Sequence, residues 1–305
     1  MGDPGAAPAP GQIGTARLPA VVTSPEALRR LTREWTKAGD QVGLVPTMGS
    51  LHPGHLSLVA RAQRECTRVV VSVFVNPLQF GQGEDYLAYP RQLESDLSLL
   101  AERGVQVCYC PAPETLYPNG FATRVSVEAG SNLWEAARRP GHFVGVATVV
   151  TKLFASTGPC QAYFGEKDAQ QLAVVRRLAQ DLDLGVTVIE CATVRDQHGL
   201  ALSSRNQLLS ARGRESAICL SRALIKAAEE FQAGVLQGDT LARAAASVIE
   251  TEPGVELHYA AVVDPSDFEP VAVASAESRV LVAAQVEGVS LIDTSSLDRP
   301  PRPSR

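Results

Sequence analysis

The sequence predicts an α/β protein: a Rossmann-like, doubly wound parallel sheet followed by a smaller α+β domain. Short apolar runs alternate with helical patterns from about residue 21 to residue 193. Most of these runs are apolar at successive positions, as expected for strands that helices cover on both faces. Beyond residue 193, two helical patterns precede two strand-like runs, and this order is typical of an α+β unit.

The parallel sheet is expected to form from apolar runs joined by segments long enough for crossover helices. Its strands are predicted at 42–45, 69–75, 105–110, 162–164 and 186–191. Ser24 and Pro25 are typical of a helix N-terminus, and Gly104 is typical of a helix end. Helices are therefore predicted from residue 24 and at 56–66, 93–103, 143–156 and 169–184.

The chain divides near Val194, where a polar loop begins, into domains 21–193 and 194–297. The second domain is expected to contain helices and strands at 211–232, 238–250, 255–263 and 279–286. Residues 1–20 are rich in proline, glycine and alanine, and the tail 298–305 contains three prolines. Both ends are therefore predicted to be disordered.

Composition disfavours several classes of protein. The net charge of -5 and the absence of a Lys/Arg run give no support for nucleic-acid binding. No apolar segment reaches membrane-spanning length, and the N-terminus lacks the pattern of a secretory signal, so a soluble, cytoplasmic protein without a membrane partner is expected. The six cysteines are expected to be reduced, with Cys108 and Cys110 on one face of a strand.

The segment 47–55, Thr-Met-Gly-Ser-Leu-His-Pro-Gly-His, follows the first predicted strand and opens a helix. A helix start offers free N–H groups and the positive end of the helix dipole, and Pro53 fits that first turn. Gly49 has no side chain where a nucleotide would approach the backbone. His52 and His55 are spaced to donate hydrogen bonds to one phosphate, where charge grows during attack on the α-phosphate. Isolated histidines are more often structural, but this pair after a strand favours an ATP site.

The pattern H-x-G-H after a strand resembles the signature of the nucleotidyltransferase superfamily that includes class I aminoacyl-tRNA synthetases. The longer string 45–56 is similar to the pantothenate synthetase family, the pantoate–β-alanine ligases. The resemblance covers residues 42–209, because further family motifs follow in the same order. They are Phe-Val-Asn-Pro-Leu-Gln-Phe-Gly from residue 74, Tyr-Pro-Arg from 89, Arg-Pro-Gly-His-Phe from 139, Gly-Glu-Lys-Asp from 165 and Leu-Ser-Ser-Arg-Asn from 202.

The resemblance implies that ATP adenylates the carboxylate of pantoate and that β-alanine then displaces AMP. It implies catalytic roles for His52, His55, Lys167, Ser203, Ser204 and Arg205. It places ATP against Met48, Gly49, Ser50, Leu51, His52, Pro53, Gly54, His55, Gly165, Glu166, Lys167, Asp168, Val194, Leu202, Ser203, Ser204 and Arg205. A lysine ammonium, hydroxyls and a guanidinium suit phosphates, although taken alone these polar loops are equally typical of a solvated surface. A homodimer and Mg²⁺ are also implied.

The resemblance puts Gln79 and Gln171 on pantoate, with Asn76 beside them. Carboxamides bind a hydroxyl and a carboxylate without adding charge, although Asn-Pro alone would also suit a simple turn. Arg139 and His142 are expected at the mouth of the site, with a plain helix entry as the alternative interpretation. The set of Asn76, Gln79 and Gln171 fits a hydroxy acid better than a phosphate substrate.

Three positions depart from the family pattern. Pro53 replaces an acidic residue common in members, and Ala169 stands where an aromatic residue is expected. Asp96 is the expected carboxylate ligand of Mg²⁺, but Ser95 stands where an acidic neighbour is expected. The roles that the resemblance implies are therefore least secure for the metal ligand and for the packing around residue 169.

Three other functions compete with the ligase hypothesis. Another H-x-G-H enzyme that adenylates a phosphate substrate would need more Arg and Lys around that substrate. A regulatory nucleotide-binding protein is expected to lack His52, His55 or Lys167, and all three are present. An RNA-binding module is disfavoured by the acidic balance.

Overall fold

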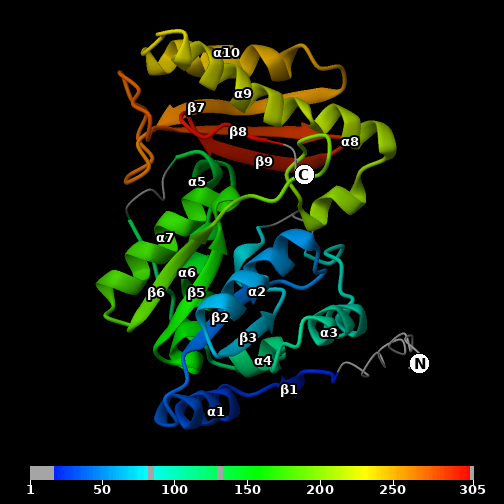
Figure 1. The fold of residues 1–305 in the computed structure, drawn as a ribbon, viewed down its shortest axis with the longest axis vertical. Coiled ribbons are helices and arrows are strands. Elements are labelled where there is room, and N and C mark those ends of the chain that lie inside the picture. Colours follow the sequence, from blue (N-terminus) through cyan, green and yellow to red (C-terminus); the bar gives the residue numbers. More distant parts are fainter. Residues whose placement is uncertain (1–16, 82–85, 129–132, 303–305) are drawn as a thin grey trace, which may run out of the picture.

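The computed structural model describes residues 17–81, 86–128 and 133–302, and it contains two sheets with helices packed against them (Figure 1). The N-terminal sheet is parallel, with strand order β1-β4-β3-β2-β5-β6, which confirms the predicted doubly wound class. Its strands are β1 Ala20–Val22, β2 Val42–Thr47, β3 Arg68–Val73, β4 Val107–Tyr109, β5 Cys160–Gly165 and β6 Val186–Cys191. The order reverses between β2 and β5, so a ligand is expected beyond their carboxyl ends.

Helices cover both faces of the parallel sheet. They are α1 Pro25–Lys37, α2 Pro53–Glu65, α3 Leu93–Glu102, α4 Pro113–Leu116, α5 Glu135–Arg138, α6 His142–Thr157 and α7 Ala169–Asp181. Leu44 of β2 packs into a core with Leu28 of α1 and Leu178 of α7. Its neighbour Val45 packs into a second core with Leu58 of α2. Successive strand residues therefore face opposite helical layers, which explains why the strands are apolar throughout.

The C-terminal sheet is antiparallel, in the order β7-β8-β9, and lies between its own helices and the N-terminal domain (Figure 1). Its elements are α8 Ala211–Ala217, α9 Cys219–Gln232, α10 Gly238–Glu250, β7 Val255–Val263, β8 Arg279–Val286 and β9 Val289–Ser296. Leu224 and Leu241, from α9 and α10, form a core with Val282. On the other side, Ala169 of α7 packs with Phe268 and joins the two domains.

The structure corrects several predicted elements. The helix predicted at 211–232 is two helices that meet at Ile218. Strands β1 and β9 were not predicted, because β1 has three residues and β9 is half polar. β1 also takes in Ala20, the last residue of the predicted N-terminal tail, whereas residues 1–16 and 303–305 lie outside the described residues.

Three short 3₁₀ turns carry site residues: η1 Pro77–Gln79, η2 Glu166–Asp168 and η3 Ser204–Leu208. The cysteines are all free thiols, and Cys108 and Cys110 contact the same core, as predicted. Within the described residues no helix has the length and apolar character needed to cross a membrane.

Candidate active site

A cavity of about 590 Å³ lies between the carboxyl ends of β2 and β5 and the C-terminal sheet. Pro46 and Gly165 line it from the parallel strands, and Leu291 and Ile292 line it from β9. It therefore occupies the position where the strand order reverses, with the antiparallel sheet as its second wall.

His52 and His55 are fixed by reciprocal capping of α2. His52 is the N-cap residue, and its Nδ1 accepts the N–H of Gly54 at 3.2 Å. Nδ1 of His55 accepts the N–H of His52 at 3.4 Å, and the two ring centroids are 4.0 Å apart. Because each Nδ1 is an acceptor, each neutral ring carries its proton on Nε2. The pair therefore presents two N–H donors, and Pro53 occupies the first turn as the sequence predicted.

Both histidines are held neutral at physiological pH. Burial, aided by the Lys167 ammonium, lowers the pKa of His52 to about 4. Burial, with the neighbouring His52 and Lys167, lowers the pKa of His55 to about 3. The rings are therefore suited to donating hydrogen bonds, and they are poorly suited to proton transfer near pH 7.

Asp96 holds the loop that precedes α2. Its two carboxylate oxygens accept the N–H groups of Ser50 at 2.9 Å and Leu51 at 2.7 Å, and the residue is 2 % exposed. Ser50 has a left-handed backbone with φ of 51°. Gly49 has φ of 82°, and a Cβ there would lie 2.9 Å from Oδ2 of Asp96. The glycine is thus required by both the turn and the buried carboxylate.

Asn76 and Gln79 form a buried carboxamide pair at the end of β3. Nδ2 of Asn76 donates to Oε1 of Gln79 at 3.0 Å and to the carbonyl of Gly145 at 3.1 Å. Oδ1 of Asn76 accepts the hydroxyl of Tyr117 at 2.8 Å. Nε2 of Gln79 contacts the sulfur of Met48 at 3.1 Å, which links the pair to the loop before α2.

Arg139, the C-cap residue of α5, and His142, the first residue of α6, brace this carboxamide pair. Nδ1 of His142 donates to the carbonyl of Gln79 at 2.8 Å, and Nε2 of the same ring accepts Arg139 at 3.1 Å. Both residues line the cavity, and His142 is 8 % exposed. Arg139 and His142 therefore do more than begin a helix, because both side chains reach the cavity beside Gln79.

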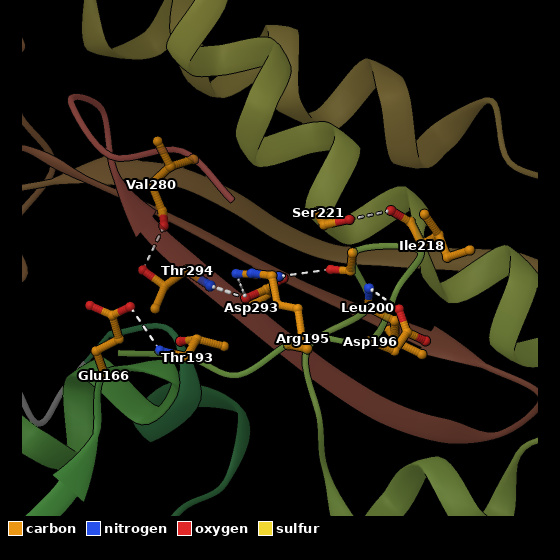
Figure 2. Close-up of polar contacts among 12 residues, drawn as sticks. Glu166, Thr193, Arg195, Asp196, Leu200, Ile218, Ser221, Val280, Asp293 and Thr294 are labelled. Carbon is orange, nitrogen blue, oxygen red and sulfur yellow. Dashed lines mark hydrogen bonds and ion pairs between the residues drawn. The ribbon is translucent and has the colours of Figure 1, made fainter. Parts of the chain in front are cut away.

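Lys167 lies in η2, directly after β5, and lines the cavity. No carboxylate in the described part of the chain forms an ion pair with its ammonium, which is close enough to lower the pKa of both histidines. Asp168 is exposed beside it and also lines the cavity. Glu166 does not line the cavity, because its Oε1 accepts the N–H of Thr193 at 3.0 Å and ties β5 to the end of β6 (Figure 2).

The loop at 203–205 reaches the cavity from the C-terminal side. Ser203 caps η3 by accepting the N–H of Arg205 at 3.3 Å. The buried Ser204 donates to the carbonyl of Ser50 at 3.3 Å, so this loop touches the loop that precedes α2. Two segments separated by 154 residues therefore contact each other beside the cavity.

Most of the predicted site residues line this one cavity: Met48, His52, Gly54, His55, Asn76, Gln79, Arg139, His142, Gly165, Lys167, Asp168, Gln171, Val194, Leu202, Ser203, Ser204 and Arg205. The others lie behind it, as backbone or as supporting side chains: Gly49, Ser50, Leu51, Pro53, Asp96 and Glu166. Sequence reasoning missed Glu135, Tyr259 and Asp293, which also line the cavity. The hydroxyl of Tyr259 donates to Glu135 at 3.2 Å across 124 residues, and no local sequence signal marks such a contact.

The described residues do not build a metal cage. They contain no cluster of three or more His, Cys, Asp or Glu side chains placed to hold a metal ion. Both oxygens of Asp96, the predicted Mg²⁺ ligand, accept backbone N–H groups, and the residue lies outside the cavity lining. Ser95, which stands where an acidic neighbour of Asp96 was expected, is exposed on the surface of α3. The geometry thus suits Asp96 for holding the loop at residues 50–51.

A parallel sheet with H-x-G-H capping the helix at its switch point defines the class of H-x-G-H nucleotidyltransferases. The family model for pantoate–β-alanine ligase matches residues 20–296. The chain therefore belongs to the pantoate–β-alanine ligase family.

Relatives of known name agree with this family. The chain is 50% identical over 285 residues to a pantothenate synthetase of Rubrobacter xylanophilus, an alignment that covers 91% of this chain and 98% of the relative. A crystal structure of pantothenate synthetase from Thermus thermophilus matches with a TM-score of 0.86 and 47% identity, covering 91% and 99% of the two chains. The Francisella tularensis ligase, solved with "Beta-gamma ATP" and β-alanine, matches with a TM-score of 0.75 and 32% identity, covering 93% and 100%.

Proposed function

We propose that this chain condenses pantoate with β-alanine at the expense of ATP, through a pantoyl-adenylate. One observation supports the residue roles: His52, His55, Lys167 and the 203–205 loop border a single cavity that the neutral carboxamides also line. Donors for phosphate and neutral groups for a hydroxy acid are thus adjacent, as adenylation of that acid requires.

In the first step, a carboxylate oxygen of pantoate attacks the α-phosphorus of ATP. The new O–P bond forms as the P–O bond to pyrophosphate breaks, and negative charge grows on the phosphoryl oxygens. The Nε2–H groups of His52 and His55 stabilise that charge without transferring a proton, as their low pKa values require. Lys167, together with Ser203, Ser204 and Arg205, is proposed to bind the phosphates.

Pantoate is proposed to lie against Gln79 and Gln171. Asn76 holds the side chain of Gln79, and His142 holds its backbone, so the carboxamide is preoriented before substrate arrives. The neutral carboxamides can hydrogen-bond a hydroxyl and a carboxylate without placing a positive charge on the carboxylate. Its oxygen therefore remains a nucleophile.

In the second step, the free amine of β-alanine attacks the carbonyl carbon of the adenylate. The C–N bond forms and the C–O bond to AMP breaks, with the electron pair leaving on AMP and the amine proton passing to solvent. Glu135 and Tyr259 line the cavity on the C-terminal side, but the reaction balances without a protein base.

We further propose that Mg²⁺ enters as the MgATP substrate, held by phosphates and water, which is its usual manner of binding beside nucleotides. Family resemblance supports a homodimer. Size-exclusion chromatography with light scattering, which measures the molar mass of the protein in solution, tests this. Six free thiols support action in a reducing compartment such as the cytoplasm.

Purified protein with MgATP tests the function directly. We expect AMP and pyrophosphate to appear only when pantoate is present, and pantothenate to form when β-alanine is added. A panel of hydroxy acids and amines run in the same assay defines the substrate class. Folded protein that makes no AMP in response to pantoate contradicts the proposal and favours a regulatory nucleotide-binding role. Adenylation of a phosphate substrate instead would favour the other H-x-G-H enzymes.

A further inference from the structure

The segment 195–210 carries the 203–205 loop, and side chains of the C-terminal sheet hold it at both ends. It begins with the isolated bridge between Arg195 and Ala201 and ends at Ser210, the N-cap of α8. Its two attachments lie on β9 and on the turn between β8 and β9. The loop is thus placed by contacts distant in sequence.

The first attachment is the buried ion pair between Arg195 and Asp293 of β9 (Figure 2). Nη1 and Nη2 of Arg195 donate to the two carboxylate oxygens at 2.6 and 2.9 Å, and the side chains are 4% and 2% exposed. Nη1 also donates to the carbonyl of Gly199 at 3.1 Å. A bidentate pair fixes direction as well as distance, so the start of the segment has a defined orientation on β9.

The second attachment is at Ser210. Its N–H and its hydroxyl donate to the two oxygens of Glu287 at 2.8 and 2.5 Å. Glu287 lies between β8 and β9. Between the two attachments, Ser204 and Gln207 contact Ser50 at 3.3 and 3.4 Å. The segment therefore spans from one hairpin to the loop before α2.

A buried ion pair is weak evidence for stability, because desolvation offsets much of its attraction. Its geometric demand is strong, because misplacing either partner leaves a buried charge unpaired. Asp293 also lines the cavity that the 203–205 loop borders. These features fit a device that sets position better than one that adds stability.

We propose that Arg195 and Asp293 are positioning residues for adenylation: their ion pair places Ser203, Ser204 and Arg205 over the reacting phosphates. This rests on the proposed function of the 203–205 loop. The pair is proposed to act through the 203–205 loop, so its removal should affect the step that handles the triphosphate. The later attack of β-alanine on the adenylate should be affected far less.

The test uses Asp293→Asn in the full chain, with Glu190→Gln as matched control. Glu190 of β6 pairs with Arg279 of β8 at 3.0 Å, so it also joins the two domains, but it lies outside the 195–210 segment. Hydrogen exchange without substrates reports order at residues 203–209 and in the α9 core. Pantoate-dependent AMP release reports the first step, and pantothenate formation from synthetic pantoyl-adenylate reports the second.

For Asp293→Asn we expect faster exchange at 203–209 with the α9 core unchanged, and AMP release slower by about tenfold or more. The second step should stay within about twofold of the parent, as should both steps in Glu190→Gln. Unchanged exchange and unchanged AMP release would overturn the proposal, as would equal loss in both steps with faster exchange throughout the core.

If Asp293→Asn does not fold, Arg195→Lys gives the same comparison, because it keeps the charge and loses the bidentate geometry. Exchange at 203–209 is measured without any reaction, so it tests the positioning role even if the parent makes no AMP. In that case the proposed function fails, but hydrogen exchange still shows whether the ion pair holds the 203–205 loop in place.

Discussion

The two walls of the cavity are positioned by different kinds of contact. On the wall formed by the parallel sheet, His52 and His55 are held by backbone groups two or three residues away. On the wall formed by the C-terminal sheet, the lining residue Asp293 is held by Arg195, 98 residues away. Short-range capping holds the two histidine donors on α2, whereas the contact on the second wall joins residues far apart in the sequence.

The largest effect is expected from the short-range wall. His55→Ala removes a donor aimed at the developing charge, and we expect adenylation to slow by about 10²–10³-fold. Pantoate-dependent AMP release at saturating ATP measures this, and ATP binding should survive in part.

His55→Asn is the matched variant. Its carboxamide oxygen can still accept the N–H of His52 and so keep the capping geometry, but it lacks the imidazole Nε2–H. We expect it to recover stability and remain slow. Near-parental rates in both variants would remove His55 from the chemistry and leave it as a cap, and the same pair of changes at His52 repeats the test.

The same contrast explains what could be predicted from the sequence. The strand ends, the capped start of α2 and the motif residues that line the cavity follow from local patterns. The strand β9 was missed because the second half of Val289–Ser296 is a run of polar residues, and its strand conformation depends on pairing with β8. Asp293 and Tyr259 were missed for the same reason, since neither has a nearby residue that predicts its partner.

The next effect tests a long-range contact on the first wall. A Cβ on Gly145 of α6 would lie 2.2 Å from the carbonyl oxygen of Leu78 and 2.6 Å from Cα of Gln79. Although alanine favours helices, we expect Gly145→Ala to destabilise the protein by about 2–3 kcal/mol, because η1 must move away from α6. Urea unfolding measures this, and the KM for pantoate should rise because Gln79 shifts with η1.

Ala155→Gly, at an exposed position of the same helix, provides the reference. It should cost only about 1 kcal/mol through helix propensity and leave the KM unchanged. A Gly145→Ala protein as stable as the parent would show that the turn at residues 77–79 can yield, and that the carboxamide wall is less rigid than its contacts suggest.

The pH dependence of stability gives a smaller effect for each histidine. The pKa values of His52 and His55 are lowered from 6.5 to about 4 and about 3, so near pH 5 the unfolded state binds more protons than the folded state. The free energy of unfolding should therefore fall as pH falls from about 6.5 toward about 4. At about pH 5 the loss should be on the order of 2 kcal/mol per histidine relative to pH 7.

Urea unfolding at about pH 7 and pH 5 measures this slope, and His55→Asn should remove roughly half of the histidine contribution. Comparing variant with parent cancels the contribution of carboxyl groups common to both. An identical slope in the two proteins would mean that the pKa of His55 is not lowered in the folded state, and burial would then not be what keeps its ring neutral.

The smallest effect is expected at Ser95, outside both walls. Ser95 is exposed in the first turn of α3, beside Asp96, whose oxygens already accept two backbone N–H groups. Ser95→Asp adds a negative charge near a helix N-terminus and should raise the free energy of unfolding by about 0.3 kcal/mol. The Mg²⁺ dependence of AMP release should not change, because both oxygens of Asp96 already accept backbone N–H groups and Asp96 cannot join the new carboxylate in binding a metal ion. A clear rise in apparent Mg²⁺ affinity would instead make residues 95–96 a metal site. Asp96 would then have to release the loop at residues 50–51, and the short-range wall would depend on the metal as well as on its caps.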